Sequence, residues 1–166
     1  MRKKGNYQTI THPLDPVFRE DSRILILGSF PSVKTREYGF FYGHPQNRFW
    51  PLMEILFEEA VGLTPEKKKA FLLRQGIALY DAIYQCDIIG SSDASVKNVI
   101  PADLEKIVRV AKITRVYCNG GTAYKYYQKY QAKQLDMEGV RLPSTSPANA
   151  RYRLKDLVEA WSQITS

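Results

Sequence analysis

Cysteine and histidine are scarce in this sequence, and their scarcity excludes several classes of protein. The 166 residues include two cysteines, Cys86 and Cys118, and two histidines, His12 and His44. Two cysteines cannot form the disulfide framework of a small secreted domain, and no Cys/His spacing fits a zinc site. We therefore expect an intracellular, cytoplasmic protein with no bound metal.

Long apolar runs are also missing. No stretch is long enough to span a membrane, and the basic start MRKKGNYQTITHPLDP has no apolar segment of the kind that a secretory signal needs. Hydrophobic residues make up 44% of the chain and charged residues 25%, which is ordinary for a globular domain. We predict a single domain over residues 1–166 that has no membrane partner. Residues 1–20 form an N-terminal extension whose order the sequence leaves open.

Three common catalytic patterns are absent as well. Ser29 follows a strand-like segment, but there is no G-x-S-x-G elbow, so a Ser-His-acid hydrolase is the less favoured alternative. No G-x-x-x-x-G-K-[ST] or G-x-G-x-x-G loop is present to bind a nucleotide, and we expect no cofactor. No closely spaced pair of carboxylates marks a two-acid glycosidase.

The chain does have an excess of positive charge. Its 24 basic and 17 acidic residues give a net charge of +7. Positive charge attracts polyanions and supplies contacts to phosphates, so it favours a nucleic-acid partner. Many small proteins have a similar balance, and the charge by itself does not decide the function.

Strand-like and helix-like segments alternate along the chain. Strands are predicted at 23–27, 77–80, 113–118 and 139–142, and helices at 47–57, 64–76, 101–111, 123–130 and 151–164. This alternation predicts a three-layer α/β/α fold with a central four-stranded parallel sheet. In such folds ligands bind beyond the carboxyl ends of the strands. Three predicted strands end in the polar loops GSFPS, CNGG and LPSTSPANA, which should therefore converge.

The stretch from 28 to 50, GSFPSVKTREYGFFYGHPQNRFW, is unusually aromatic. Phe49 and Trp50 begin the apolar stripe of the next helix, so we interpret them as core residues. For Tyr42, which precedes Gly43, core packing and ligand binding are equally good interpretations. Rings, amides, hydroxyls and backbone N–H groups are suited to a nucleobase, because a ring stacks on its face and neutral polar groups bind its edge.

Taken together, GSFPS, FFYGHPQNRFW, LYDAI, GSSDAS, CNGGTAY and LPSTSPANA resemble the uracil-DNA glycosylase superfamily, above all its hypoxanthine (deoxyinosine) branch. The resemblance covers about residues 24–149. It implies a monomeric, monofunctional enzyme of base excision repair that needs no cofactor or metal and hydrolyses the N-glycosidic bond of a flipped-out deaminated base in DNA, most of all hypoxanthine. The alternatives are a uracil or mismatch glycosylase, an inactive DNA-binding relative, and a lyase that uses Lys34 or Lys97.

The resemblance also implies roles for individual residues. Mismatch-type relatives have a catalytic asparagine in G-x-N-P-G, but Phe30 takes that place here, so the catalytic amide is expected from Asn47. Tyr42 matches a ring that stacks on the base, and Ser29, Phe30 and Asn119 are expected to contact the base as well. The residues expected to contact DNA are Pro31, Ser32, His44, Leu142, Pro143, Ser144, Thr145, Ser146, Pro147 and Arg151. Within this set Leu142, Pro143 and Pro147 are candidate wedges, and Ser144, Thr145 and Ser146 are candidate phosphate ligands.

Overall fold

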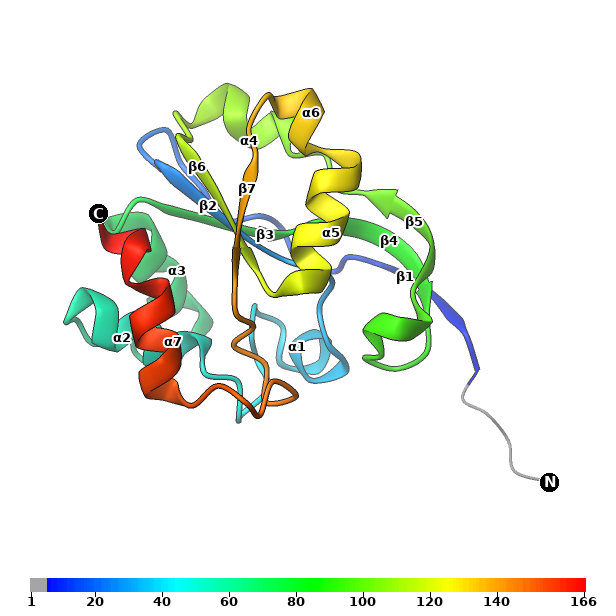
Figure 1. The fold of residues 1–166 in the computed structure, drawn as a ribbon, viewed down its shortest axis with the longest axis horizontal. Coiled ribbons are helices and arrows are strands. Elements are labelled where there is room, and N and C mark those ends of the chain that lie inside the picture. The colour runs from blue at the N-terminus through cyan, green and yellow to red at the C-terminus, as the bar shows by residue number, and fades with distance from the viewer. Residues whose placement is uncertain (1–5) are drawn as a thin grey trace.

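The computed structural model describes residues 6–166 and contains two β-sheets (Figure 1). The larger sheet has four parallel strands in the order β3-β2-β6-β7. These are β2 (Ile24–Gly28), β3 (Ile77–Asp81), β6 (Arg115–Asn119) and β7 (Gly139–Leu142). Strands β2 and β3 are buried along their whole length, which explains why their sequences are continuous aliphatic runs. The predicted parallel sheet is confirmed.

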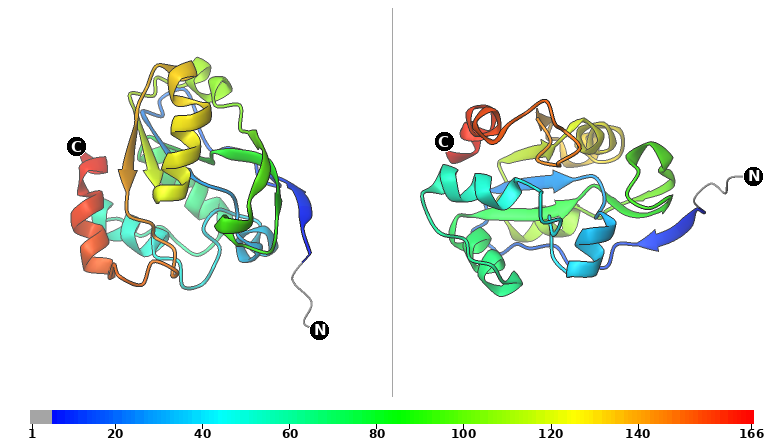
Figure 2. Two further views of the ribbon diagram at one scale, coloured as in Figure 1. Left: turned by 45° about the vertical axis from the view of Figure 1, so that its right-hand side comes forward. Right: turned by 90° about the horizontal axis from the view of Figure 1, so that it is seen from below.

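Helices lie on both sides of this sheet. Helix α5 (Gly121–Tyr130) packs on β6 and β7, and α3 (Pro65–Arg74) packs on β3. The view from below in Figure 2 shows α5 and α7 (Leu154–Trp161) on one side of the sheet and α3 on the other. Helix α2 (Phe49–Phe57) contacts α7, and the short helices α4 (Glu105–Val110) and α6 (Ala132–Leu135) lead into β6 and β7. The three-layer α/β/α prediction is therefore confirmed.

Local signals explain where some helices begin and why others differ from the prediction. The Thr64 side chain accepts a hydrogen bond from the N–H of Lys67 and caps α3, as the Thr-Pro start signal predicts. The helix expected to open at Pro101 begins later, because Pro101 ends a strand and the next residue, Ala102, donates its N–H to the Ala82 oxygen. The last predicted helix is shorter than expected and ends in a 3₁₀ turn, Ser162–Thr165.

A second, antiparallel sheet was not predicted. It contains β1 (Gln8–Thr11), β4 (Ile83–Ile88) and β5 (Lys97–Pro101) in the order β1-β4-β5. Strands β1 and β5 are mostly exposed, so they have no buried alternation to reveal them. Since β1 pairs with β4, the described part of the N-terminal segment belongs to the fold, and residues 1–5 lie outside the described residues.

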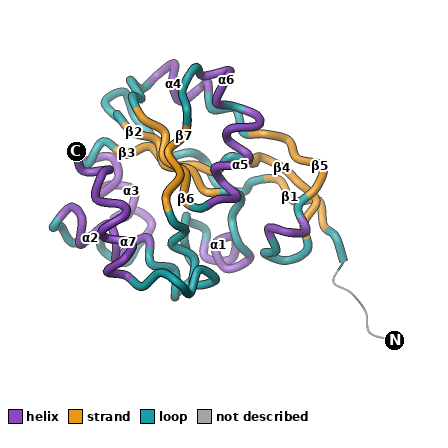
Figure 3. The backbone as a smooth tube through the Cα atoms, in the orientation of Figure 1, coloured by secondary structure: helices purple, strands orange, loops and turns teal. Residues whose placement is uncertain are grey.

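The chain passes directly from one sheet to the other at Ala82. Strand β4 follows β3 after this single residue, and the Ala82 N–H donates to the Gly28 oxygen. The last residue of β3, Asp81, therefore lies at the junction of the two sheets. The tube in Figure 3 shows loops gathered below the parallel sheet, where β2 and β7 end.

A short helix, α1 (Val33–Tyr38), was also not predicted. It follows the GSFPS loop, and the Ser32 side chain caps it by accepting from the N–H of Thr35. Within residues 6–166 no helix combines the length and the apolar character that crossing a membrane would require.

Candidate active site

A cavity of about 320 Å³ opens at the carboxyl ends of the parallel strands. Its lining comes from the loops after β2, β6 and β7, from the loop before α2, from α1, from the end of β3, and from the end of β4 and the segment after it. The predicted convergence of the three polar loops is confirmed, and the volume is typical of a pocket for a small ligand. The predicted site residues that line it are Ser29, Phe30, Pro31, Ser32, Tyr42, His44, Asn47, Asn119, Ser144, Thr145, Ser146 and Pro147.

Asn47 is held by two hydrogen bonds to its side-chain oxygen. The Phe49 N–H donates to Asn47 Oδ1 across 2.9 Å, and the Thr145 hydroxyl donates to the same oxygen across 2.8 Å. Asn119 continues this row of hydrogen bonds. Its Nδ2 donates to Thr145 Oγ1 across 3.0 Å, and its Oδ1 accepts from the Thr145 N–H across 2.9 Å. Thr145 is 1% exposed, so its buried hydroxyl links the predicted catalytic amide to a predicted base-binding amide.

The backbone N–H groups of Phe49 and Thr145 determine the direction of every hydrogen bond that links Asn47, Thr145 and Asn119. An N–H can only donate, so the Asn47 oxygen must face the Phe49 N–H and the Asn119 oxygen must face the Thr145 N–H. The two lone pairs of Asn47 Oδ1 are then used by Phe49 and Thr145. Among the described residues nothing accepts from Asn47 Nδ2, which is therefore the group that Asn47 offers to the cavity.

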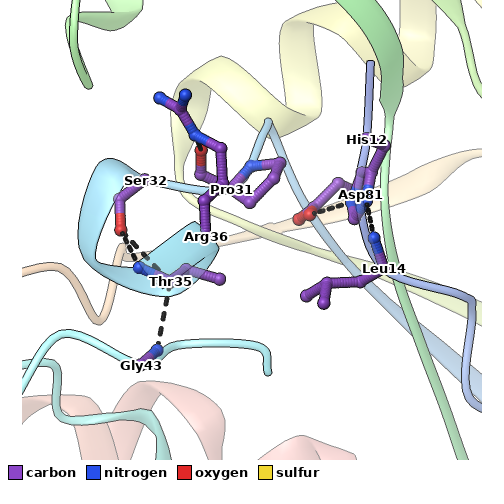
Figure 4. A network of polar contacts seen from close by, with 8 residues as sticks. All are labelled: His12, Leu14, Pro31, Ser32, Thr35, Arg36, Gly43 and Asp81. Carbon is purple, nitrogen blue, oxygen red and sulfur yellow. Dashed lines mark hydrogen bonds and ion pairs between the residues drawn. The ribbon is translucent and has the colours of Figure 1, made fainter. Parts of the chain in front are cut away.

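Tyr42 has a backbone conformation that is rare for its residue type. Its φ is +55°, a left-handed value that favours glycine and is uncommon for a bulky residue. The next residue, Gly43, donates its N–H to Thr35 Oγ1 across 3.0 Å and holds the turn in place (Figure 4). The half-buried Tyr42 ring stacks on Phe49 with the centroids 4.2 Å apart, and it lines the cavity. Phe49 and Trp50 are core residues, as predicted.

The Tyr42 hydroxyl is buried and has no hydrogen-bond partner among residues 6–166. Burial raises the pKa of this phenol, the negative charge of Asp81 raises it further, and the Asn119 amide opposes the shift. A buried polar group without a partner costs about 1–3 kcal/mol. A polar ligand or a water that reached the hydroxyl would remove this cost.

The Arg48 side chain holds the loop after β7 by binding the backbone oxygens of that loop. The guanidinium donates to the oxygens of Thr145 across 3.2 Å, Ser146 across 2.7 Å and Asn149 across 3.1 Å, and it also contacts the Tyr152 oxygen. A planar guanidinium has five N–H donors in a fixed geometry, which suits it to several carbonyls at once. Apart from the position of Arg48 beside Asn47, no pattern in the sequence indicated this role.

Two further residues that the sequence did not single out, Asp81 and His12, lie below the cavity. Asp81 is 4% exposed, and His12 Nε2 lies 2.7 Å from Asp81 Oδ2 (Figure 4). The Leu14 N–H donates to the other ring nitrogen, His12 Nδ1, across 3.1 Å. Asp81 Oδ1 stands over Gly28, where an added Cβ would lie 2.3 Å from it, so the first position of GSFPS requires glycine. The pair joins residues 69 positions apart, and no local pattern could reveal it.

A second carboxylate, Asp93, lies at the rim of the cavity on the 3₁₀ turn Asp93–Ser95. Although the residue is exposed, desolvation of its carboxyl group raises the pKa of Asp93, while hydrogen bonds from Ser29 and Thr122 lower it in part. The Ser29 hydroxyl donates to Asp93 Oδ1 across 3.3 Å. The fold thus brings Asp81 and Asp93 to one cavity, although their spacing in the sequence did not indicate a pair of carboxylates.

Two of the predicted DNA contacts are wrong because the side chains are buried. Leu142 is 2% exposed within the hydrophobic core, so it cannot enter a duplex as a wedge. Thr145 uses its hydroxyl inside the protein rather than on a phosphate. Pro143 and Arg151 lie outside the cavity lining, Pro143 with its oxygen bonded to Trp161 Nε1 across 2.9 Å and Arg151 exposed before α7.

The two lysines considered for a lyase lie in different places. Lys34 lines the cavity, whereas Lys97 lies on β5 with its Nζ 3.9 Å from the centroid of the Tyr7 ring. No cluster of three or more His, Cys, Asp or Glu side chains suited to a metal ion occurs between residues 6 and 166.

Comparison with known proteins agrees with this geometry. Two proteins named hypoxanthine DNA glycosylase are similar to the chain: one from Methanosarcina acetivorans is 29% identical over 149 residues, and one from Methanosarcina barkeri is 30% identical over 153 residues. Each comparison covers 89% of this chain and 93% of the relative. A solution NMR structure from M. acetivorans, provisionally assigned as a uracil DNA glycosylase, has a TM-score of 0.80 at 28% identity and covers 95% of this chain and 97% of its own.

The family model of the uracil DNA glycosylase superfamily matches residues 16–165, nearly the whole chain. The match includes every loop that lines the cavity. The chain therefore belongs to the uracil DNA glycosylase superfamily and is a DNA glycosylase.

Proposed function

We propose that the protein is a monofunctional glycosylase that removes a flipped-out deaminated base, most of all hypoxanthine, from DNA in base excision repair. The observation that carries this proposal is that Tyr42 and Asn47 line one cavity, where the Asn47 amide is held with its Nδ2 unbonded to any of residues 6–166. The names of the two Methanosarcina relatives support hypoxanthine as the base.

Asn47 acts by holding the attacking water. An amide has no pKa suited to proton transfer, so Asn47 orients the water and does not deprotonate it. Its Nδ2 donates to one lone pair of the water and leaves the other lone pair for C1′ of the sugar. The water oxygen bonds to C1′, the bond from C1′ to the purine nitrogen breaks, and its electron pair leaves with the base. The proton that the water loses ends on the released base through solvent, so the products are free hypoxanthine and an abasic site.

Stacking and neutral donors hold the base while charge develops on it. Stacking on the Tyr42 ring contributes about 1–3 kcal/mol of binding. Backbone N–H groups of Ser29 and Phe30 and the amide of Asn119 are the donors nearest to the departing base, and one such donor is commonly worth about 3 kcal/mol in kcat. Extruding hypoxanthine costs little, because extrusion is cheapest where a base is mispaired.

The DNA backbone lies across the cavity mouth. Ser144 and Ser146 are half-buried in the loop that Arg48 holds, where their hydroxyls are suited to short phosphate contacts. Pro147 in the same loop is the remaining candidate for a wedge at the cavity, and the exposed Arg151 follows it toward α7. The net charge of +7 favours this binding and makes it sensitive to salt.

The test is a panel of duplexes with a single hypoxanthine, uracil or mispaired thymine, followed by alkaline cleavage at abasic sites. We expect release of hypoxanthine to be fastest, and Asn47→Ala to lower single-turnover release on the order of 100- to 1000-fold while DNA binding persists. Gln46→Ala is the matched control, because Gln46 is the exposed neighbour of Asn47 and does not line the cavity.

The outcomes separate the alternatives. Full activity of Asn47→Ala would show that the catalytic assignment is wrong. Faster release of uracil or thymine would identify a uracil or mismatch enzyme, and binding to an abasic duplex without turnover on any lesion would identify an inactive relative. A covalent DNA adduct trapped by borohydride would identify a lyase, with Lys34 as the nucleophile that the cavity offers.

A further inference from the structure

Leu63, in the loop between α2 and α3, is 89% exposed, more than any other large hydrophobic side chain within residues 6–166. Its backbone is nevertheless held in place. The Tyr38 hydroxyl donates to the Leu63 oxygen across 3.0 Å, and the side chain of the next residue, Thr64, caps α3. The preceding Gly62 packs so closely on Lys67 that an added Cβ would lie 2.6 Å from Lys67 Cδ. Because Tyr38 is itself 40% exposed, two large side chains form one apolar surface on a fixed backbone.

The loop that carries Leu63 lies at the same end of the sheet as the cavity. Helix α3 follows this loop and returns into β3 through Gln75 and Gly76, so the helix and the strand that it packs on are antiparallel. The 10 residues of α3 span about 15 Å, and the 5 residues of β3 span about 16 Å. The start of α3 is therefore level with the end of β3, where Asp81 lines the cavity.

Tyr38 connects Leu63 to the rim of the cavity. Its side chain lies against Gly43, where an added Cβ would be 2.8 Å from both Tyr38 Cβ and Cδ2. The two neighbours of Gly43 in the chain, Tyr42 and His44, both line the cavity. Leu63 is thus about one tyrosine side chain away from the rim.

The proposed phosphate contacts lie on the opposite side of the cavity. Ser144 and Ser146 follow β7, which is one edge of the parallel sheet, whereas Leu63 precedes the helix that packs on β3, the other edge. In the view from below in Figure 2, α1 and α3 lie on one side of the sheet and the loop before α7 lies on the other. The second strand of a duplex lies across a groove about 6 Å or about 12 Å wide. If the serines hold the strand with the everted nucleotide, the second strand lies on the side of Leu63.

The charge next to Leu63 also suits DNA. Lys67, Lys68 and Lys69 follow Leu63 closely, and Glu66 is the only acidic residue in the same stretch, residues 62–69. Lys67 and Lys69 are exposed, and the stem of Lys67 packs beside Leu63 at Gly62. Proteins that bind and bend a duplex combine apolar side chains, leucine among them, with lysine or arginine in the same way.

From this arrangement we propose that Leu63 packs against the strand opposite the lesion and that Lys67 contacts a phosphate of that strand. The inference rests on the proposed function and extends it, because it specifies a duplex as the preferred substrate. Leu63 can make this contact only where a second strand is present. Its contribution is therefore confined to duplexes, whereas Tyr42 and Asn47 act on the everted nucleotide in any substrate.

Leu63→Ser tests the contact through the difference between duplex and single-stranded substrates. We expect kcat/KM for hypoxanthine in a duplex to fall on the order of tenfold, because the buried area of the leucine side chain is lost, and kcat/KM for the single strand to stay the same. Val110→Ser is the matched control. Val110 is 48% exposed at the end of α4, which leads into the start of β6 at the far end of the sheet.

Two further variants separate the apolar contact from the ionic one. Tyr38→Phe keeps the ring but removes the hydroxyl that holds the Leu63 oxygen, so duplex release should fall about threefold with no change on single strands. Lys67→Gln should lower the slope of log Kd against log salt concentration by about 1 for a duplex, and Leu63→Ser should leave that slope unchanged. Lys106→Gln, on the exposed side of α4, is the control for loss of a lysine.

Disulfide trapping locates the contact without depending on catalysis. Leu63→Cys introduces an exposed thiol, and the native Cys86 and Cys118 are both buried. The duplex carries a 2′-fluoro nucleotide of hypoxanthine, which resists cleavage, and one base at a time in either strand bears a tether that ends in a mixed disulfide. The new thiolate displaces the small thiol of the tether and becomes joined to the DNA. We expect trapping on the strand opposite the lesion, within about three nucleotides of the base that faces hypoxanthine, and none with Val110→Cys.

The outcomes are distinct. If the wild-type protein releases no hypoxanthine from any substrate, the proposed function is wrong. If it releases hypoxanthine and Leu63→Ser matches it on duplexes, or loses as much activity on single strands as on duplexes, the proposed function stands and the contact with the second strand is overturned. If the wild-type protein does not act on single strands, the trapping experiment decides. Trapping on the lesion strand alone, or on neither strand, overturns the contact and leaves the leucine to a protein partner.

Discussion

The buried hydroxyl of Thr145 links Asn47 to Asn119, so removing it tests how the candidate active site is organised. Thr145→Val keeps the size and the branching of the side chain and removes only the hydroxyl. The donor to Asn47 Oδ1 and the acceptor for Asn119 Nδ2 are lost together. The backbone bond from the Thr145 N–H to Asn119 Oδ1 does not depend on the side chain and should remain.

The size of the effect follows from these contacts. A buried donor left without a partner costs about 1–3 kcal/mol, and here Asn119 Nδ2 is such a donor. For a chain of this length that corresponds to a fall in Tm of roughly 2–12 °C. Asn47 retains the Phe49 N–H but loses the second constraint on its amide, and a displacement of about 1 Å at a catalytic group can cost about 100-fold in rate. We expect kcat to fall about 10- to 100-fold with a smaller change in KM.

The assay is steady-state and single-turnover release of hypoxanthine from a defined duplex, with thermal unfolding measured on the same samples. Thr145→Ser is the control, because it keeps the hydroxyl and loses only a methyl group. It should retain most of the activity. If the valine and serine variants have the same kcat, the hydroxyl does not position Asn47 and the account of the chain from Asn119 to Asn47 is incorrect.

Two further predictions concern residues that shape the cavity. Gly28→Ala would place a Cβ 2.3 Å from Asp81 Oδ1, so overpacking should cost about 1–3 kcal/mol, visible as a lower Tm and slower hypoxanthine release; an unchanged Tm would contradict the close approach. Arg48→Lys replaces the guanidinium, which contacts four carbonyl oxygens, by an ammonium that has three N–H donors on one atom. The ammonium cannot bind all four carbonyls, so residues 143–152 should be digested faster in limited proteolysis while the helical circular dichroism stays the same. Arg74→Lys, on an exposed ion pair with Glu59, is the control, and equal digestion of both variants would exclude the clamp.

The parts of the fold that the sequence predicted are those whose burial shows as a local pattern. The strands ILILG and IALYD are buried at every position, so the parallel sheet could be read from the aliphatic runs. The second sheet could not, because β1 and β5 are mostly exposed and owe their pairing to β4 rather than to a hydrophobic face of their own. Helix α1 has six residues and one buried side chain, Thr35, which is too little to produce a helical period.

The residues of the candidate site also fall into two groups, those that the sequence could identify and those that it could not. Asn47, Tyr42 and Asn119 could be identified because a motif resembled a family and because loops after parallel strands converge. His12 and Asp81 could not, because their pairing depends on how the N-terminal segment crosses the end of β3. The burial of Leu142, the last residue of β7, and of Thr145, in the Pro/Ser-rich loop that follows, was also not predicted, since neither position belongs to a local pattern of burial.

The pair that joins His12 to Asp81 ties the candidate active site to the very start of the described chain, while its opposite wall comes from residues 144–148. The pocket is therefore finished only after both ends of the polypeptide have docked. A nascent chain on the ribosome, or a fragment cut on either side of the domain, would lack one wall or the support of the floor. Such incomplete chains would lack a complete cavity. They could contact DNA but would not release bases from it until folding is complete.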